Sequence, residues 1–352
     1  MILRSIFNRL LFLLVFIPAC AQISDETQQS NEVKTTPYEL EIPVGFTEPV
    51  LAEDNPLNQE KIALGQKLFF DPLLSKDSSI SCASCHFTHK AFSDTVRFSI
   101  GVDDSLGIRN APPLFNLAWN EAYMRDGGVP TLAMQVISPI QDEREMHNTV
   151  MDVIDRLNVH PEYPQLFQTA FNDSITPFTL TRAIEAFEWT LISGNSPFDR
   201  FEYQQEEKAL SPSAQRGWEL FKSDRLNCIQ CHSEFNFTNN TYQCNGLYEN
   251  YEDVGRARIT HDSTDIGKFK VPSLRNLGFT APYFHDGSAA DLNEVIDHYA
   301  AGGKRHFNQS ELIGGFELNE QERFDLIEFL CSLNDSSFVS NTKKLNPTNI
   351  EL

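Results

Sequence analysis

Two copies of the pattern C-x-x-C-H constrain this chain more than any other feature. The first reads CASCH and the second CIQCH, and the second begins 146 residues after the first (82 to 228). Two cysteines followed directly by a histidine are typical of c-type haem attachment, in which the thiols add to the porphyrin vinyl groups and the imidazole ligates the iron. The sequence therefore predicts two covalent haems, held by Cys82, Cys85 and His86 and by Cys228, Cys231 and His232.

C-x-x-C pairs also occur in zinc sites and in thiol–disulfide centres. Paired zinc motifs usually lie about 15–20 residues apart. The two pairs here are much further apart and each has its own histidine, so haem is favoured over zinc. Two further cysteines, Cys244 and Cys331, are expected to be lone buried thiols rather than a disulfide.

The first 45 residues predict export and a tether. Two arginines precede an apolar run, residues 10–17, which is too short for a bilayer that needs about 20 apolar residues. The tetrapeptide IPAC is similar to a bacterial lipobox, so Cys20 is either a lipid-anchor site or part of an ordinary cleaved signal. We predict a signal peptide over 1–20, a flexible tether over 21–45 and a periplasmic protein, either free or anchored as a lipoprotein.

An internal repeat predicts two related haem units. The segment from Pro112, PPLFNLAWNEAYMRDGGVPTL, aligns without a gap on that from Pro272, PSLRNLGFTAPYFHDGSAADL. Each half also has a Gly-x-x-Leu-Phe run before its haem motif, at 65–69 and 217–221. Such self-similarity indicates duplication, and the apolar spacing between the motifs is helical. We therefore predict an all-α fold of two cytochrome c-like haem domains related by internal duplication, with bounds 46–205 and 206–340 and a tail over 341–352.

The formal net charge of −21 argues against nucleic acid as a partner. An electron-donor protein would bind a local patch or carry positive charge itself. The oligomeric state does not follow from the sequence, and a homodimer is one of the assemblies that it allows.

The second iron cannot take a sixth ligand from a methionine of its own half, because all five methionines precede residue 228. Residues 291–303 predict a helix with a capping-box start and a glycine end. Tyr299 falls on its apolar face, whereas His298 points away. A tyrosine packed in the core with its hydroxyl bonded elsewhere is an equally good interpretation. The other candidate ligands are His261, His285, His298 and His306, and a site that stays open is the remaining alternative.

Several stretches in the same order resemble the bacterial di-haem cytochrome c peroxidase/MauG family: SCASCH, RNAPP, MQVISPI with EM, FKVPSLRN and APYFHDGS. The resemblance covers about residues 55–335. It implies an N-terminal peroxidatic haem, a C-terminal haem that relays electrons, and calcium between the domains.

The resemblance implies that Gln135 and Glu145 line the peroxide pocket, where a carboxylate can move a proton between the peroxide oxygens. Without the resemblance, Glu145 would belong to a solvated acidic run, 142–145. Where peroxidases of the family place a removable histidine within Gly-His-Gly, this chain has Gly101-Val102-Asp103. We therefore expect an open N-terminal iron that needs no reductive activation.

The sixth ligand of the second iron, a Met in the peroxidases and a Tyr in MauG, falls on Tyr299, in agreement with the helical-face argument. A family tryptophan between the haems is replaced by Arg125, and Trp119 could take over its role. The calcium ligands that the resemblance implies are Asn110 and the backbone carbonyls of Lys270 and Pro272.

These residues predict an oxidoreductase of the cytochrome-c peroxidase type. It would reduce hydrogen peroxide to water with electrons from a small periplasmic donor, a cytochrome c or a cupredoxin, relayed through the C-terminal haem. One alternative is a MauG-like oxidase that acts on a partner protein's side chains, favoured by Tyr299 and the missing distal histidine. The other is a di-haem electron carrier, against which an open iron and a pocket carboxylate argue.

Overall fold

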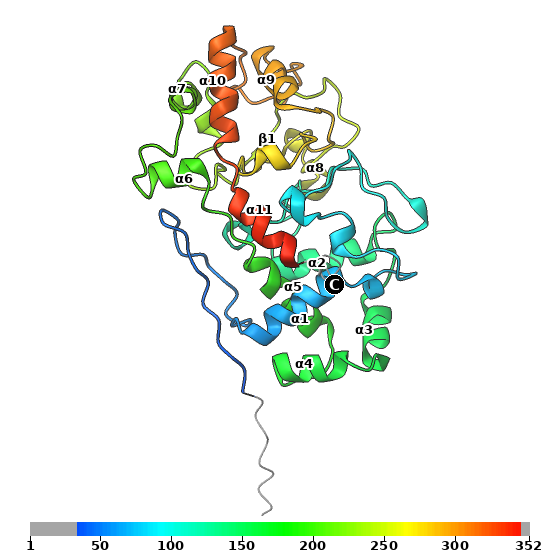
Figure 1. The fold of residues 1–352 in the computed structure, drawn as a ribbon. Coiled ribbons are helices and arrows are strands. Elements are labelled where there is room, and N and C mark those ends of the chain that lie inside the picture. Colours follow the sequence, from blue (N-terminus) through cyan, green and yellow to red (C-terminus); the bar gives the residue numbers. More distant parts are fainter. Residues whose placement is uncertain (1–33, 346–352) are drawn as a thin grey trace, which may run out of the picture. The chain divides into compact units, whose positions relative to one another are not determined.

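Short helices joined by long loops make up residues 34–345, the part of the chain that the structure, a computed structural model, describes (Figure 1). Two short strands in this part, β1 (Tyr242–Gln243) and β2 (Phe269–Lys270), pair antiparallel. The architecture is therefore rich in helix with little sheet, as the predicted all-α class requires. The α-helices of the described residues are α1 (Gln59–Phe70), α2 (Leu132–Gln141), α3 (Val150–Val159), α4 (Tyr163–Phe171), α5 (Pro177–Trp189), α6 (Pro197–Glu202), α7 (Pro212–Lys222), α8 (Ala257–Thr260), α9 (Leu292–Ala300), α10 (Glu320–Cys331) and α11 (Ser336–Thr342).

The helices start where the local sequence predicts. Ser211 caps α7, where its side chain accepts a hydrogen bond from the Ala214 N–H, and proline follows at the first helical position. Asp291 caps α9 by accepting from two backbone N–H groups, and the chain leaves this helix at Gly302 with a φ of 77°.

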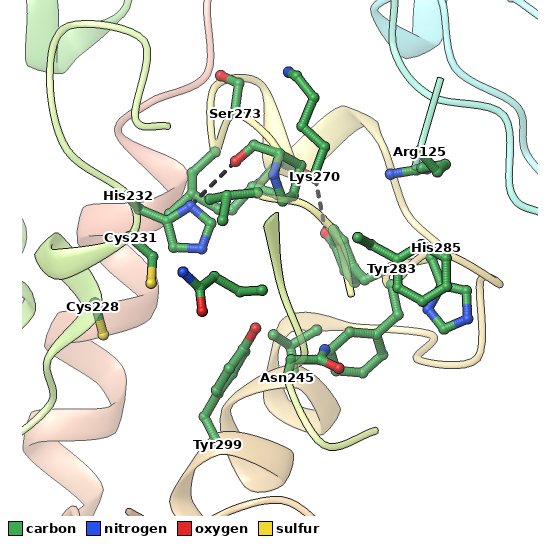
Figure 2. A pocket seen from close by; sticks show the side chains of 18 of the residues that line it. Arg125, Cys228, Cys231, His232, Asn245, Lys270, Ser273, Tyr283, His285 and Tyr299 are labelled. Atoms are coloured by element: carbon green, nitrogen blue, oxygen red, sulfur yellow. Dashed lines mark hydrogen bonds between the residues drawn. The ribbon is translucent and has the colours of Figure 1, made fainter. Parts of the chain in front are cut away.

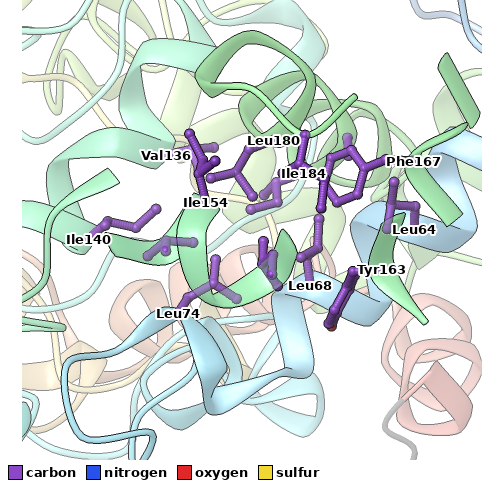
Figure 3. Close-up of a cluster of buried hydrophobic side chains, with 14 of the residues drawn as sticks. Leu64, Leu68, Leu74, Val136, Ile140, Ile154, Tyr163, Phe167, Leu180 and Ile184 are labelled. Atoms are coloured by element: carbon purple, nitrogen blue, oxygen red, sulfur yellow. The ribbon is translucent and has the colours of Figure 1, made fainter. Parts of the chain in front are cut away.

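The first hydrophobic core lies among α1 to α5 (Figure 3). Leu64 and Leu68 of α1 lie in this core together with Leu180 of α5. Gly65 lies where α1 packs on α5, and a Cβ there would be 1.9 Å from the Ala183 backbone oxygen. Only glycine allows the two helices to approach this closely.

The second core is built in the same way around α7, α9 and α10, with an aromatic cluster that includes Phe221 and Phe329. A Cβ on Gly217 of α7 would lie 1.9 Å from the backbone oxygen of Asp325 in α10. Beside this core, Arg275 and Asp199 form an ion pair in which both side chains are fully buried.

The repeated segments also share their local structure. Asn116 and Asn276 both adopt left-handed backbone, with φ of 53° and 61°. The hydroxyl of Tyr123 donates to the Leu117 carbonyl at 3.1 Å, and that of Tyr283 donates to the Leu277 carbonyl at 2.8 Å. Each segment then leads into a helix, α2 in the first half and α9 in the second.

Helix α11 lies against residues around the first haem motif although it follows the second core. The ring of Phe338 lies 6.1 Å from that of Phe92, and Thr342 contacts the Thr88 carbonyl. The described residues, 34–345, belong to one compact unit, so the predicted bounds of two haem domains stay predictions. No helix of residues 34–345 has the length and apolar character needed to cross a membrane. The predicted signal peptide, Cys20 and the start of the tether lie outside the described residues.

Candidate di-haem active site

Each C-x-x-C-H motif forms a single 3-10 turn, over Cys82–Ser84 and over Cys228–Gln230. In each turn the backbone N–H of the histidine donates to the carbonyl of the first cysteine, at 3.0 Å in both motifs. None of the four thiols is joined in a disulfide. The two motifs therefore share one local geometry that keeps the thiols beside their histidine.

Backbone carbonyls fix the orientation of both imidazoles. Nδ1 of His86 lies 2.8 Å from the Phe92 oxygen, and Nδ1 of His232 lies 3.1 Å from the Phe237 oxygen and 3.2 Å from the Pro272 oxygen. Because a carbonyl oxygen can only accept a hydrogen bond, Nδ1 must carry the proton. The unprotonated Nε2 then has a lone pair with which it can ligate a metal. Burial lowers the pKa of both histidines, that of His232 to about 4, so both rings are neutral.

A cavity of about 410 Å³ opens beside His232. Cys228, Cys231 and His232 lie on its wall, and so do Tyr299 and the apolar residues of the α9 face that the helical spacing predicted, Leu292, Val295 and Ile296. Figure 2 shows the His232 ring and the Tyr299 hydroxyl pointing into the same space. Thiols, a neutral imidazole and a phenol around an apolar cavity fit a covalent haem with one protein ligand on each face.

The alternative histidines are engaged elsewhere or lie at the edge of this cavity. Nε2 of His298 lies 3.0 Å from the Asn245 carbonyl, and His285 stacks on Phe269 with ring centroids 3.8 Å apart. Burial raises the pKa of Tyr299 to about 12. Iron ligation by this phenol stays a prediction, which its position supports.

Glu145 does not share the environment of the acidic run that precedes it. Residues 142–144 are exposed, whereas Glu145 is half-buried. Burial, with a smaller effect of Asp142, raises the pKa of Glu145 to about 7. The Glu145 carboxylate in turn helps to raise the pKa of the thiols of Cys82 and Cys85, in both cases after the larger effect of burial. The fold therefore brings this carboxyl to the first haem motif.

Gln135, the second predicted pocket residue, is half-buried on α2, with its side-chain nitrogen 3.9 Å from the Met124 sulfur. The chain folds back after α2, where the Met146 N–H donates to the Pro139 carbonyl at 3.0 Å. This return places Glu145 close to the end of the helix that carries Gln135. Among the hydrogen bonds of the described residues, none joins the side chains of Gln135 and Glu145 directly.

The segment in place of Gly-His-Gly packs directly on Glu145. The Val102 N–H donates to the Glu145 carbonyl at 2.8 Å, and the Val102 side chain is buried. A Cβ on Gly101 would lie 2.1 Å from the Arg144 oxygen, so this close approach requires glycine. Asp103 is exposed beside His147. The segment therefore offers no buried side chain that could ligate an iron.

The residues predicted to bind calcium have other partners. Both the side-chain oxygen and the backbone oxygen of Asn110 accept hydrogen bonds from the Arg125 guanidinium, and the Pro272 carbonyl faces Nδ1 of His232. The backbone N–H of Lys270 donates to the Arg125 carbonyl and its side chain donates to Asn120, although neither is the predicted ligand atom, which is the Lys270 carbonyl. A calcium ion needs six to eight oxygen ligands around it, and this set does not fit one.

Glu188 of α5 was missed by the sequence reasoning. Its side chain is 3% exposed, one carboxyl oxygen has no hydrogen-bond partner, and burial followed by repulsion from Glu185 raises its pKa to about 8. Its charge contributes to the raised pKa values of Cys82 and Tyr123. The signal was present, because Glu185 and Glu188 interrupt an otherwise apolar helical stretch, AIEAFEW.

Two other residues that the sequence singled out lie outside the cavity wall. The Trp119 ring packs between Phe46 and Phe235, with ring centroids 5.5 and 5.8 Å away. The Cys244 thiol is free and fully buried, 3.6 Å from a ring nitrogen of His306. Cys331 is also in no disulfide but is only half-buried, so the expectation of a lone buried thiol is met by Cys244 and only in part by Cys331.

Comparison with known proteins decides the family. The family profile described as di-haem cytochrome c peroxidase matches residues 59–208. The methylamine utilization protein MauG of Methylorubrum extorquens is 39% identical over 283 residues, which is 79% of this chain and 79% of that protein. The chain belongs to the di-haem cytochrome c peroxidase/MauG family. It is therefore an oxidoreductase of the peroxidase type, as predicted, and the family implies two haem c groups.

The relatives of this chain include proteins named as peroxidases and proteins named as MauG or MauG-like. The cytochrome c551 peroxidase of Nitrosomonas europaea is 35% identical over 283 residues, 79% of this chain and 81% of that protein. The crystal structure of a MauG-like protein associated with microbial copper homeostasis superposes with a TM-score of 0.83 at 31% identity, over 89% of this chain and all of that one.

Proposed function

We propose that this protein is a periplasmic di-haem c peroxidase that reduces hydrogen peroxide to water. The haem held by Cys82, Cys85 and His86 would be the peroxidatic centre. The haem held by Cys228, Cys231, His232 and Tyr299 would relay electrons from a small donor protein, a cytochrome c or a cupredoxin. Peroxide as the substrate is supported by relatives named cytochrome c551 peroxidase.

The observation that carries the proposal is the half-buried Glu145 carboxyl beside the first haem motif, with a pKa of about 7. A general acid–base group works best when its pKa lies near the working pH. Pro139, whose carbonyl accepts from the Met146 N–H next to Glu145, occupies the position in α2 that corresponds to Tyr299 in α9 by the repeat offset of 160 (112 to 272). Proline has no ligand atom, which supports an open iron at the first site.

Bound haem would supply the peroxide-binding metal and the electron-transfer chemistry at this site. The Glu145 carboxylate accepts the proton of one peroxide oxygen and returns it to the other, so that the O–O bond breaks with water as the leaving group. Gln135 orients the peroxide through its amide. The balance is one peroxide, two electrons and two protons for two waters, and the protein must draw the electrons from its donor.

A MauG-like oxidase is the second candidate, and Tyr299 favours it. A phenolate is an anionic oxygen ligand and stabilises the more oxidised iron relative to a methionine. Such a protein would withdraw electrons from side chains of a partner protein instead of a soluble donor. The relatives named MauG and MauG-like support this reading.

The origin and location of the protein belong to the same proposal. The matched glycines at 65 and 217, the paired asparagines in left-handed backbone and the paired tyrosine hydroxyls support two haem units that arose by duplication. Two covalent haem motifs and the predicted signal peptide support export to the periplasm, with Cys20 as the candidate lipid anchor.

Steady-state peroxide consumption by the diferric holoprotein, with reduced cytochrome c or a reduced cupredoxin in excess, tests the proposal. We expect donor oxidation with two electrons for each peroxide consumed. Peroxide consumption that proceeds only with oxidation of a partner protein's side chains would favour the MauG-like function. Reversible donor oxidation without any peroxide consumption would identify an electron carrier.

A further inference from the structure

Arg125 occupies the site that the family resemblance assigns to calcium. Its Nη2 lies 2.9 Å from the side-chain oxygen of Asn110 and 3.1 Å from the Asn110 backbone oxygen, and its Nε lies 3.2 Å from that backbone oxygen. Asn110 itself is 2% exposed, and its side-chain N–H donates to the Val96 carbonyl. The guanidinium thus holds both oxygens of the residue that a calcium ion would need.

Arg125 also reaches a second member of the predicted calcium set. Its backbone carbonyl accepts the Lys270 N–H at 2.8 Å, which joins the first half of the chain to β2. The Lys270 ammonium lies on the same cavity wall as Arg125 and donates to Asn120. Figure 2 shows Arg125 on the side of the cavity away from Cys228.

Arg125 and Lys270 bring positive charge here without a carboxylate partner. In the described part of the chain, neither side chain lies within ion-pair distance of an acid. Each side chain is held by a neutral oxygen instead, that of Arg125 by Asn110 and that of Lys270 by Asn120.

Three of the nearby carboxylates, those of Asp286, Asp126 and Asp253, have other partners. Asp286 accepts from Arg97 and from the Tyr248 hydroxyl, both at 2.6 Å. Asp126 pairs with Arg109 and Arg258, and Asp253 pairs with Arg109. Glu121 is exposed, and its charge acts on Lys270 against the effect of burial. A calcium ion at Asn110 would lie against a guanidinium of the same sign.

We propose that Arg125, assisted by Lys270, provides the positive charge and the cross-link that the family resemblance assigns to calcium, so that this protein binds no calcium at Asn110. One substitution then explains both the loss of the family tryptophan and the loss of the calcium site. The arginine that replaces the family tryptophan between the haems is the residue that takes over the Asn110 oxygens. The proposal rests on the contacts of Arg125 and does not depend on which reaction the haems perform.

Metal analysis of the holoprotein tests the proposal without an activity assay. Samples dialysed against a calcium chelator, and against calcium followed by desalting, should both contain two irons per chain and far less than one calcium. Their absorption spectra and unfolding temperatures should be the same. One equivalent of calcium per chain, with a haem spectrum or unfolding temperature that changes when the chelator removes it, would overturn the proposal.

The variant Arg125→Met gives a second, independent readout, because it frees the Asn110 oxygens and removes a charge while keeping an extended side chain. Calorimetric titration with calcium alone should give an affinity at least about tenfold higher than for the unaltered protein, since the like charge is gone. Arg156→Met is the matched control, because the Arg156 guanidinium also donates to backbone carbonyls, those of Leu73, Ser75 and Lys76, far from Asn110.

The variants allow two outcomes against the proposal. Equal calcium affinity for Arg125→Met and the unaltered protein would show that the guanidinium does not block a site at Asn110. An equal gain of affinity in Arg156→Met would show that the gain is not specific to that site. If Arg125→Met does not fold, the metal content and chelator response of the unaltered holoprotein still decide the question.

Discussion

Glu145→Gln is the substitution that separates a proton-transfer group from a surface acid. It keeps the size and polarity of the side chain and removes its ability to take up and return a proton. General acid–base help is typically worth 10²–10⁴-fold, so we expect kcat/KM for peroxide to fall by ~10²-fold or more, which is about 3 kcal/mol of transition-state stabilisation. Both haems should stay attached, with nearly unchanged spectra.

The pH profile gives the sign of the effect. With a pKa of about 7, Glu145 is protonated below this pH and cannot accept the peroxide proton. The kcat/KM of the unaltered protein should therefore rise with pH through a midpoint near 7, and this rise should be absent in Glu145→Gln. Both proteins should be assayed with peroxide and a reduced cytochrome c between pH 5 and pH 9.

The free energy of unfolding should fall as the pH rises, whereas kcat/KM should rise. Burial raises the pKa of Glu145 from 4.5 to about 7, so the folded state binds the proton more tightly than the unfolded state. The cost of the buried charge is absent below the unfolded pKa and is complete above pH 7, where it amounts to at most about 3 kcal/mol. Glu145→Gln should therefore unfold at a higher temperature than the unaltered protein at pH 8, and at a similar temperature at pH 4.

Glu143→Gln is the matched control, because Glu143 lies in the same acidic run and is exposed. It should leave the rate, the pH profile and the stability unchanged. An unchanged peroxide rate in Glu145→Gln, or an equal loss in Glu143→Gln, would show that Glu145 does not transfer the peroxide proton and is an ordinary solvated acid of this run.

Substitutions at Tyr299, Gly65 and Arg275 test other parts of the structure. Tyr299→Phe should alter the spectrum and potential of the C-terminal haem with both haems still bound, and Tyr299→Met should raise that potential; unchanged optical and redox titrations would make Tyr299 a core residue. Gly65→Ala should lower the free energy of unfolding by about 1–3 kcal/mol, because α1 must move away from α5, whereas Gly314→Ala, which meets no atom within 4 Å, should unfold at the unaltered temperature. Arg275→Leu leaves Asp199 buried without its partner and should cost about 3–5 kcal/mol in denaturant unfolding; a loss below about 1 kcal/mol would show that the pair is not a stabilising contact.

Features carried by neighbouring residues could be predicted from the sequence. The haem motifs, the helix starts at Ser211 and Asp291 and the face of α9 that carries Tyr299 each depend on a few consecutive residues. The repeat also predicted where glycine recurs, although only the structure explains it. Gly65 and Gly217 each face the backbone of a helix more than a hundred residues away.

Features that depend on long-range packing could not be predicted in this way. The acidic run around Glu145 looks solvated until the chain folds back on α2 and Val102 packs on it. The Arg125 contacts with Asn110 appear only when the loops meet, so the family resemblance led to a calcium prediction that these contacts oppose. The return of α11 to the first haem motif has no local signal either.

The central claim is that the two irons differ, one open beside Glu145 and one closed by Tyr299. The most direct measurement is the EPR spectrum of the resting diferric holoprotein, recorded for the unaltered protein and for Tyr299→Phe. We expect a high-spin signal from the His86 haem in both samples and a low-spin signal from the His232 haem that changes only in the variant. Low-spin signals alone in the unaltered protein, or identical spectra in both samples, would contradict it.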